Sequence, residues 1–328
     1  MNAAWYEKQG PAREVFVIGK MPDPEPGPGE VRIRVAVSGI NPGEVKKRQD
    51  AYGLGMPYPR VIPHSDGAGT IDRVGAGVFA SRIGERVWCY GAQSYRAFGT
   101  AAEYVVVPST QAVSLLDSVS FEQGACLGIP GITAHRAVHC AAPVAGRAVL
   151  VQGGAGAVGC CAVGLARLAG AHVFATVRSE ADAAVAARAG AHEVVRTDGR
   201  STEEIVGQFH ALAPSGVDHI VEVAFDANIA VDTELLAVGG SLAAYAARNA
   251  TPLIPFRPLV FKNIRVFFLG SDDFPVEAKA EAAEALNAML NTRWPRFRID
   301  QRFSLAEVAE AHEYLEARRG SGRVVVTM

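Results

Sequence analysis

The chain has 328 residues, of which 49% are hydrophobic and 20% are charged, a composition that supports two domains with large cores and argues against disorder. Its 32 Lys and Arg residues nearly balance its 34 Asp and Glu residues, which disfavours nucleic acid and membrane surfaces as partners. No run of about 18 apolar residues predicts a membrane span, and residues 1–7 lack the pattern of a secretory signal. The five cysteines form no C-x-x-C pair, so we expect free thiols, a reducing compartment and a cytoplasmic protein.

The first third of the chain is expected to form an antiparallel, barrel-like β domain. Short strands are predicted at residues 3–6, 14–18, 30–37, 70–74, 86–88 and 101–107, because apolar runs there are separated by Gly and Pro. The four prolines between residues 22 and 28 form a stiff connector, since proline fixes φ and lacks a backbone donor. Residues 38–44 are expected to be a loop.

From about residue 121 the pattern changes to alternating helices and strands. Residues 121–140 are rich in alanine and predict helix, and buried-type strands follow at 148–152, 171–177, 193–195, 217–224, 241–244 and 264–269. This alternation predicts a doubly wound parallel sheet, so the fold class is α/β. Two closing helices are expected at 277–291 and 305–318, and a last strand at 323–327 is expected to rejoin the first domain.

A glycine-rich turn follows the first strand of this second region. Gly154, Gly156 and Gly159 satisfy the spacing G-x-G-x-x-G, directly after an apolar strand and at the start of an apolar helix. In a dinucleotide site these glycines allow the tight turn, the close approach of the pyrophosphate and the packing of helix on strand. Free N–H groups at the helix N-terminus then attract the phosphates. We therefore predict a dinucleotide cofactor at Gly154, Ala155, Gly156, Ala157, Val158 and Gly159.

The end of the next strand indicates which dinucleotide binds. NAD sites place Asp or Glu about 20 residues after the glycines to hold the ribose 2′-OH, whereas this strand ends in Val177, Arg178 and Ser179. A guanidinium matches a 2′-phosphate in charge and shape. A solvated surface arginine is the alternative interpretation, but the missing carboxylate also favours NADPH.

A family resemblance rests on several segments taken together. They are the glycine motif, the proline-rich lead, the Asn41-Pro42 loop, residues 128–134, residues 190–194 and residues 308–313. The chain resembles the zinc-independent quinone oxidoreductases of the medium-chain dehydrogenase/reductase superfamily, in particular the zeta-crystallin type, over essentially its whole length. The resemblance implies a Rossmann domain at residues 123–269, binding NADPH, inserted into a GroES-like catalytic domain at residues 1–122 and 270–328.

The resemblance also implies which residues contact the cofactor and the acceptor. Asn41 resembles the family's cleft asparagine and Tyr52 the tyrosine of its Ser-Gly-x-Tyr segment, so both are expected at the catalytic centre; packing beside nearby prolines is the alternative for Tyr52. Lys46 replaces a cleft tyrosine and is expected to contact a phosphate or to be solvated. Further cofactor contacts are expected from Thr133, Ser179, Arg196, Asn228, Tyr245, Ala246, Ala247 and Arg323, and from the backbone of Phe267, Phe268 and Leu269.

The ligands of a catalytic zinc are missing from the corresponding positions. A catalytic zinc needs three protein ligands and one open position. Where zinc members of the superfamily have a first-loop cysteine this chain has Asn41, and their Gly-His-Glu is replaced by His64, Ser65 and Asp66. The third ligand would fall near Ile129. Since a lone histidine such as His64 is more often structural than a ligand, we expect no metal.

Without zinc, acceptors that take a hydride directly are favoured. A quinone or an activated alkene qualifies, because its oxygens carry the charge that develops while the nicotinamide does the hard chemistry. The first hypothesis is an NADPH:quinone reductase. The second is an NADPH-dependent alkenal, enone or enoyl reductase on the same scaffold, and the third is a cofactor-binding protein without turnover.

The strand at residues 264–268 also suggests an oligomer. It reads Ile-Arg-Val-Phe-Phe and is expected at the end of the cofactor sheet's order. An exposed apolar edge is a liability unless it is paired, and the family resemblance suggests a second subunit. A two-fold dimer is the commonest closed solution, so we expect a homodimer.

Overall fold

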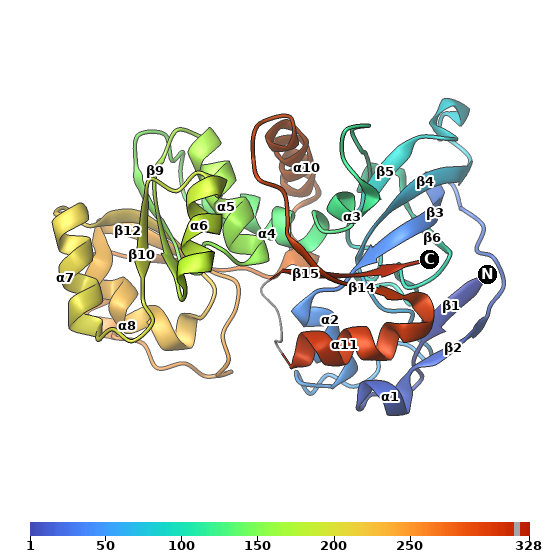
Figure 1. Ribbon diagram of the computed structural model, residues 1–328, viewed down its shortest axis with the longest axis horizontal. Coiled ribbons are helices and arrows are strands. Elements are labelled where there is room, and N and C mark those ends of the chain that lie inside the picture. Colours follow the sequence, from blue (N-terminus) through green and yellow to red (C-terminus); the bar gives the residue numbers. More distant parts are fainter. Residues whose placement is uncertain (318–321) are drawn as a thin grey trace. The chain divides into compact units, whose positions relative to one another are not determined.

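The computed structural model describes residues 1–317 and 322–328, and the chain divides into two compact units. Unit 1 comprises residues 1–129 and 296–328, and unit 2 comprises residues 130–295. The discontinuous first unit was expected, but the divisions fall at 129/130 and 295/296 instead of 122/123 and 269/270. Unit 1 contains a two-stranded and a seven-stranded sheet, and unit 2 contains a six-stranded sheet; Figure 1 labels their strands.

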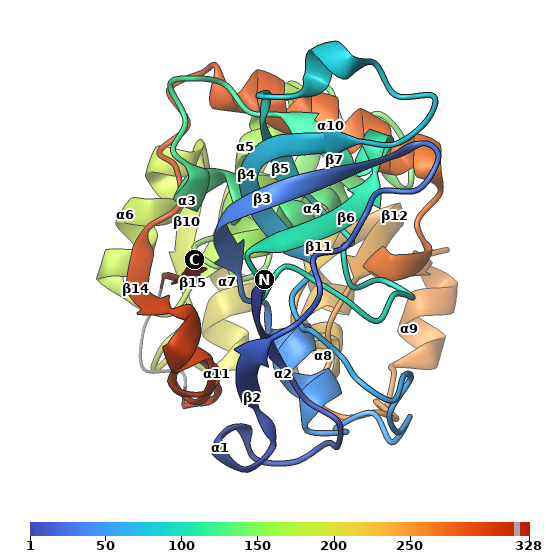
Figure 2. The same cartoon turned by 90° about the vertical axis from the view of Figure 1, so that its right-hand side faces the viewer.

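Unit 1 is built on a seven-stranded, mostly antiparallel sheet (Figure 2). Its order is β14-β15-β3-β4-β5-β7, and β6 also pairs with β3. The β14–β15 pair is parallel, and β15 joins β3 antiparallel, so the C-terminal strand rejoins this domain as expected. The strands are β3 (Glu30–Gly39), β4 (Asp66–Val74), β5 (Arg86–Cys89), β6 (Tyr104–Pro108), β7 (Ala112–Ser114), β14 (Ile299–Ser304) and β15 (Arg323–Thr327).

A small hairpin and several short helices complete unit 1. The hairpin pairs β1 (Asn2–Trp5) with β2 (Val17–Lys20). The helices are α1 (Ala12–Val15), α2 (Pro42–Arg48), α3 (Phe121–Gly124) and α11 (Val308–Glu316), with 3₁₀ turns at η1 (Ala80–Arg82), η2 (Ser109–Gln111) and η4 (Leu305–Glu307). Buried aliphatic side chains from the two sheets and from α11 form its core.

Three expectations for unit 1 are corrected by the structure. Residues 14–18 are not one strand: α1 ends at Val15 and β2 begins at Val17, because antiparallel pairing with β1 places Val17 opposite Trp5. Residues 38–44 are not a loop: β3 continues to Gly39, and α2 begins at Pro42. The helix expected at 305–318 is a 3₁₀ turn followed by α11, and Arg318 lies outside the described residues.

Unit 2 is a six-stranded parallel sheet of order β10-β9-β8-β11-β12-β13, which confirms the doubly wound Rossmann fold. The strands are β8 (Ala148–Val151), β9 (His172–Val177), β10 (Glu193–Arg196), β11 (Val217–Glu222), β12 (Leu236–Ala244) and β13 (Arg265–Phe268). The order reverses at β8, where right-handed crossovers send the following helices to the other face of the sheet.

The helices of unit 2 cover both faces of its sheet. They are α4 (Gly128–His139), α5 (Ala157–Leu168), α6 (Glu180–Ala189), α7 (Thr202–Leu212), α8 (Phe225–Leu235), α9 (Phe256–Phe261) and α10 (Val276–Leu290), with a 3₁₀ turn η3 (Ser271–Asp273). α10 packs on α5, and Trp294 donates its indole N–H to the Cys160 carbonyl. These contacts explain why residues 270–295 belong to unit 2 and not to the catalytic domain in which we expected them.

Candidate functional site

The carboxyl ends of the parallel strands of unit 2 lie along one edge of the sheet. In a doubly wound sheet, ligands bind beyond this edge at the point where the strand order reverses. Here that point lies between β8 and β11, which are neighbours in the sheet. The glycine turn follows β8, and the predicted Arg178 and Ser179 follow β9, so the sheet brings these groups to the same edge.

The glycine turn has the geometry of a phosphate cradle. Gly153, at φ +68°, makes the turn that we had assigned to Gly154. Gly154 must lack a side chain for another reason, because a Cβ there would lie 2.7 Å from the Cβ of Ala175 on β9. A Cβ on Gly159 would lie 2.2 Å from the Gly153 carbonyl oxygen. Gly156 is exposed at the start of α5, whose N-terminus has no side-chain cap; Ala155, Ala157 and Val158 are half-buried around it.

The two predicted arginines of the 2′-phosphate region differ in their surroundings. Arg178 is exposed beyond β9. Arg196, at the end of β10, forms a bidentate pair with Asp198 and a further contact with Glu180, so its guanidinium is already neutralised. Ser179 accepts the N–H of Asp182 and caps α6.

The predicted adenosine-side and nicotinamide-side residues occupy the ends of the remaining strands. Asn228 on α8 donates to both carboxylate oxygens of Glu222 at 3.1 Å. Tyr245 follows β12, and its N–H donates to the Glu222 carbonyl. The N–H of Leu269 donates to the Ala244 carbonyl, so this amide is already used within the sheet. Thr133 is buried on α4, Ala246 and Ala247 are half-buried after Tyr245, and Phe267 and Phe268 pair with β12.

In unit 1 the predicted catalytic Asn41 is buried and fully hydrogen-bonded. Its side chain is 3% exposed. Its Nδ2 donates to Asp66 at 2.7 Å and lies 3.5 Å from Glu44, and its Oδ1 accepts from Arg323 at 2.9 Å. Asp66 also accepts the N–H of Ile129 at 2.9 Å. Burial and the neighbouring Asp66 carboxylate raise the pKa of Glu44 to about 7.

Tyr52 is exposed and Lys46 is half-buried, in contrast to the buried Asn41 and Arg323. Tyr52 is 51% exposed in the turn after α2. The Lys46 ammonium, on α2, lies 5.8 Å from the centre of the Tyr52 ring, within the range of a cation–π contact. The exposure favours a contact of Tyr52 with a ligand over the packing role that we considered.

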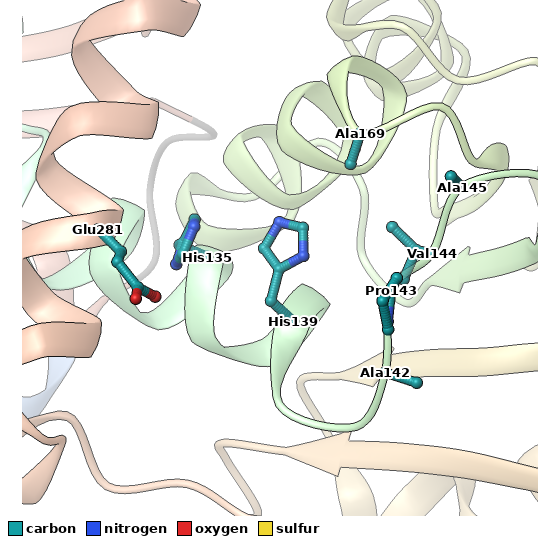
Figure 3. Close-up of a pocket in the computed structure, with 8 residues that line it drawn as sticks. All are labelled: His135, His139, Ala142, Pro143, Val144, Ala145, Ala169 and Glu281. Atoms are coloured by element: carbon teal, nitrogen blue, oxygen red, sulfur yellow. The ribbon is translucent and has the colours of Figure 1, made fainter.

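A surface cavity of unit 2 lies away from this edge (Figure 3). It measures about 440 Å³ and is lined by residues 142–145, Ala169, and the side chains of His135, His139 and Glu281. Residues 142–145 precede β8 and Ala169 follows α5, so the cavity is at the amino-terminal edge of the sheet. It is therefore not the predicted dinucleotide site, and among the described residues no cluster of three or more metal-ligating side chains was found that could hold an ion.

Comparison with known proteins identifies the family. The model of the alcohol dehydrogenase GroES-like domain matches residues 27–117, and that of the zinc-binding dehydrogenases matches residues 157–287. The quinone oxidoreductase of Mus musculus is 33% identical over 88% of this chain and 85% of its own, and that of Homo sapiens is 32% identical over 85% and 83%. The chain belongs to the quinone oxidoreductases. It is an oxidoreductase of the medium-chain dehydrogenase/reductase superfamily, as the sequence resemblance predicted.

Solved structures agree with this assignment. A mycobacterial quinone oxidoreductase is 26% identical, with a TM-score of 0.86 over the whole of both chains. The quinone oxidoreductase of Thermus thermophilus, which was also solved in complex with NADPH, is 28% identical with a TM-score of 0.81, again over both whole chains.

The residues of this quinone oxidoreductase do not fit the zinc that one matching family model implies in its name. The structure brings together the three positions compared above with zinc ligands: Asn41, the Ser65-Asp66 pair and Ile129. The Asn41 amide is bonded to the Asp66 carboxylate and to the guanidinium of Arg323, and these groups offer no thiolate or free imidazole. The ring of His64 is bonded on both nitrogens elsewhere.

Two buried polar groups of residues escaped sequence reasoning. One joins Arg48, His312 and His64 in unit 1, and the other joins Glu222 and Asp232 in unit 2. Their members are 10 to 264 positions apart in the chain. A sequence signal existed for Glu222, which closes an apolar strand. A carboxylate is rarely buried at such a position unless it is hydrogen-bonded.

Proposed function

We propose that this quinone oxidoreductase transfers a hydride from NADPH to a quinone and needs no metal. The observation that carries the proposal is the glycine turn with its exposed Gly156, at the same sheet edge as the exposed Arg178, whose strand end lacks the carboxylate of an NAD site. The NADPH complex of the Thermus thermophilus relative supports the same cofactor.

The chain's own groups would hold NADPH along the carboxyl edge of unit 2. The N–H groups at the start of α5 would receive the pyrophosphate. Arg178 would bind the 2′-phosphate, with Ser179 and Arg196 beside it, and Asn228 would lie on the adenosine side. The proposed set is completed by Thr133, residues 245–247, the backbone of residues 267–269 and Arg323. Because Arg323 is buried against Asn41, its proposed role is to support the segment that carries Asn41.

On the acceptor side we propose Tyr52 as a direct contact and Asn41 as the residue that positions it. When bound, NADPH supplies the hydride, and a quinone accepts it because its oxygens carry the developing charge. The exposed hydroxyl of Tyr52 can donate to such an oxygen. Asn41 caps α2, the helix from which the Tyr52 turn extends, and Lys46 is proposed to orient the Tyr52 ring or to meet a phosphate.

The proposal includes a cytoplasmic homodimer. All five cysteines are free thiols, as expected for a reducing compartment. Among the described residues, the structure contains no helix with the length and apolar character of a membrane span. The exposed edge strand β13 supports pairing of two subunits, and the test of this pairing is given in the Discussion.

Steady-state oxidation of NADPH tests the function directly. We expect turnover with a 1,4-quinone and little with an alkenal, since the curated relatives that match are quinone oxidoreductases. Turnover should survive prolonged chelation, and elemental analysis should find far less than one zinc per chain. Stoichiometric zinc together with turnover that is lost on chelation would refute the metal-free proposal, and turnover with alkenals alone would establish the second hypothesis.

A further inference from the structure

Two buried carboxyl groups lie in contact behind the glycine turn. Glu222 ends β11 and Asp232 lies on α8, and both are 0% exposed. Asn228, one turn before Asp232 on α8, donates to both carboxylate oxygens of Glu222, so the helix brings the Asp232 carboxyl next to that of Glu222, and the two groups interact electrostatically. Two carboxylates have no hydrogen to share and would repel each other, so the contact requires a proton on one of them.

The surrounding donors decide which group carries the proton. Glu222 accepts hydrogen bonds from the backbone N–H of Ala224 and from Nδ2 of Asn228, and these donors stabilise its charged form. Asp232 accepts one bond, from Nε2 of Gln152 at 2.7 Å on Oδ1. Its Oδ2 is buried and has no donor among the described residues. That oxygen is satisfied only if it bears the hydrogen and donates it to Glu222.

A chain of hydrogen bonds leads from Asp232 to the glycine turn. Gln152, which donates to Asp232, accepts the hydroxyl hydrogen of Thr176 on its Oε1. Thr176 accepts the N–H of Gly153 at 3.1 Å on its hydroxyl, and its carbonyl accepts the N–H of Gly154 at 2.9 Å. Each side chain in this series of hydrogen bonds donates once and accepts once, so the direction of every bond in it is fixed.

We infer that Asp232 is a neutral carboxylic acid in the folded protein and that its proton positions the glycine turn for the pyrophosphate of the cofactor. The inference rests on the proposed function, since it takes NADPH as the occupant of that turn. Asp232 is a positioning residue: it acts through Gln152 and Thr176 and touches neither cofactor nor acceptor. The proton holds the ends of β8, β9 and β11 in one arrangement.

The electrostatic surroundings agree with this assignment. Burial and the Glu222 charge raise the pKa of Asp232 well above its ordinary value. Tyr245, after β12, also faces Glu222, and Cys161 of α5 lies near Tyr245. Lys262 is directed to the carbonyl groups of Thr233, Glu234 and Leu236 at the end of α8, so its charge stabilises the helix end.

Carbon-13 NMR of aspartate side-chain carboxyls tests the protonation state without cofactor. The Asp232 signal is assigned by its loss in Asp232→Asn. We expect it at the shift of a carboxylic acid at pH 7, whereas exposed aspartates such as Asp198 appear as carboxylates. An Asp232 signal at the carboxylate shift would overturn the inference, whatever the protein binds.

Affinity for NADPH tests the positioning role. Asp232→Asn keeps a donor toward Glu222 and an acceptor toward Gln152, so its Kd should stay within about 2-fold of the wild type, whereas Asp232→Ala should weaken binding by about 2- to 10-fold. Thr176→Val removes the link to Gly153 with little change in shape and should weaken binding by a similar factor. Thr233→Val is the matched control, because among the described residues the buried Thr233 hydroxyl bonds within α8, to the Ile229 carbonyl.

The outcomes separate this inference from the proposed function. Unchanged affinity in Thr176→Val, or equal weakening in Asp232→Asn and Asp232→Ala, would overturn the positioning role. If Asp232→Ala does not fold, the Thr176→Val and Asp232→Asn pair still decides. A wild type that binds no NADPH but shows the neutral Asp232 signal would refute the proposed cofactor and the positioning of it, while the assignment of the proton would stand.

Discussion

Arg178 is the residue on which the choice of cofactor depends. It is exposed beyond β9, and it forms no hydrogen bond or ion pair with any other residue in 1–317 or 322–328. Arg196 is the opposite case, since Asp198 and Glu180 already neutralise it. A free guanidinium loses no internal partner when it binds a phosphate, so Arg178 contributes more to binding than Arg196 does.

Replacement of Arg178 should therefore change cofactor preference. A charge-assisted hydrogen bond contributes about 1.5–3 kcal/mol, so Arg178→Ala should weaken NADPH by about 10- to 100-fold and leave NADH nearly unchanged. Titration of both cofactors checks this. Arg147→Ala is the control, because Arg147 is also exposed but lies before β8, at the other edge of the sheet. Tighter binding of NADH than NADPH by the wild type would contradict the prediction.

Asn41 and Tyr52 should give different results although sequence reasoning placed them together. Tyr52→Phe removes an exposed hydroxyl, so kcat/KM for a quinone should fall about 3- to 10-fold with unchanged stability; Tyr104→Phe, on β6, is the control. Asn41→Ala removes the buried amide that bonds both Asp66 and Arg323, so it should lower the free energy of unfolding by about 2–4 kcal/mol. Kinetics and urea unfolding separate the two effects, and a stable but inactive Asn41→Ala would restore a catalytic role.

Asn41 and the glycine turn show what a single sequence can predict about individual residues. The residues around Asn41 predicted a loop at the catalytic centre, whereas the structure places Asn41, buried, at the start of α2, and its partner Arg323 is 282 positions away. No local pattern indicates that pairing, because it depends on how the C-terminal strand β15 joins β3. The glycine turn was predictable because its function depends on the local backbone.

At the scale of elements, a chain of buried side chains joins β3 to α11. The Thr100 hydroxyl donates to the Asp66 carbonyl at 2.7 Å, so it accepts from Ser38 at 2.7 Å. Ser38 then accepts from Nδ1 of His64 at 2.8 Å, which leaves Nε2 of His64 as an acceptor. The positive φ of His64, +74°, is held within this packed arrangement.

The directions of the remaining hydrogen bonds in this series follow from those already assigned. Nε2 of His64 receives the hydrogen of Nε2 of His312, at 2.9 Å. Nδ1 of His312 is then an acceptor and faces Nε of Arg48 at 3.4 Å. Both imidazoles are therefore neutral, because a proton added to either one would place two donors against each other.

The two neutral histidines predict how the stability of the protein depends on pH. Burial lowers the pKa of His64 to about 3, and burial together with the neighbouring His64 ring and the positive charge of Arg48 lowers that of His312 well below its ordinary value. The unfolded chain takes up these protons below about pH 6.5 and the folded chain does not, so the stabilisation is complete above that pH and is lost as pH falls toward 3. Each histidine lowers the free energy of unfolding by about 1.4 kcal/mol per pH unit in this range.

Variants isolate the contribution of one histidine. His312→Gln keeps a donor and an acceptor but does not titrate, so the slope of unfolding free energy against pH should fall by about 1.4 kcal/mol per unit between about pH 6 and 4. Urea unfolding at several pH values measures the slope. His210→Gln, at an exposed site on α7, should leave it unchanged. Equal slopes in His312→Gln and the wild type would show that His312 is not held neutral.

Secondary structure was predictable where one hydrophobic pattern continues through a whole strand or helix. The six parallel strands were located to within a few residues because their apolar runs are bounded by turns, although β12 begins at Leu236, five residues before the expected start. Helix α2 was missed, although Asn41, Pro42 and Glu44 form a capping box with proline in the first turn. The seven-residue helix is too short for a hydrophobic period to show.

At the scale of the molecule, the edge of the cofactor sheet is open in the single chain. β13 is the last strand in the order, as predicted, and Phe268 is 71% exposed on it. Phe256 and Phe261, on the preceding helix α9, are 67% and 78% exposed. Exposed aromatic side chains next to an unpaired strand edge mark an interaction surface. Around a two-fold axis β13 would meet its own copy antiparallel, and one contact would cover both edges.

The proposed homodimer predicts a mass of about 69 kDa in light scattering at micromolar concentration, twice the 34.6 kDa of the chain. Phe268→Glu should shift the protein toward the monomer, because the two-fold axis would bring two buried carboxylates together and their desolvation is costly. Phe79→Glu is the matched control: Phe79 is 82% exposed but belongs to unit 1, so this variant should remain a dimer. A wild type of 34.6 kDa would refute the dimer, and a dimer that tolerates Phe268→Glu would place the interface on another surface. Loss of the dimer in Phe268→Glu should be accompanied by faster hydrogen exchange in β13, since the N–H groups of an edge strand are protected only when they are paired.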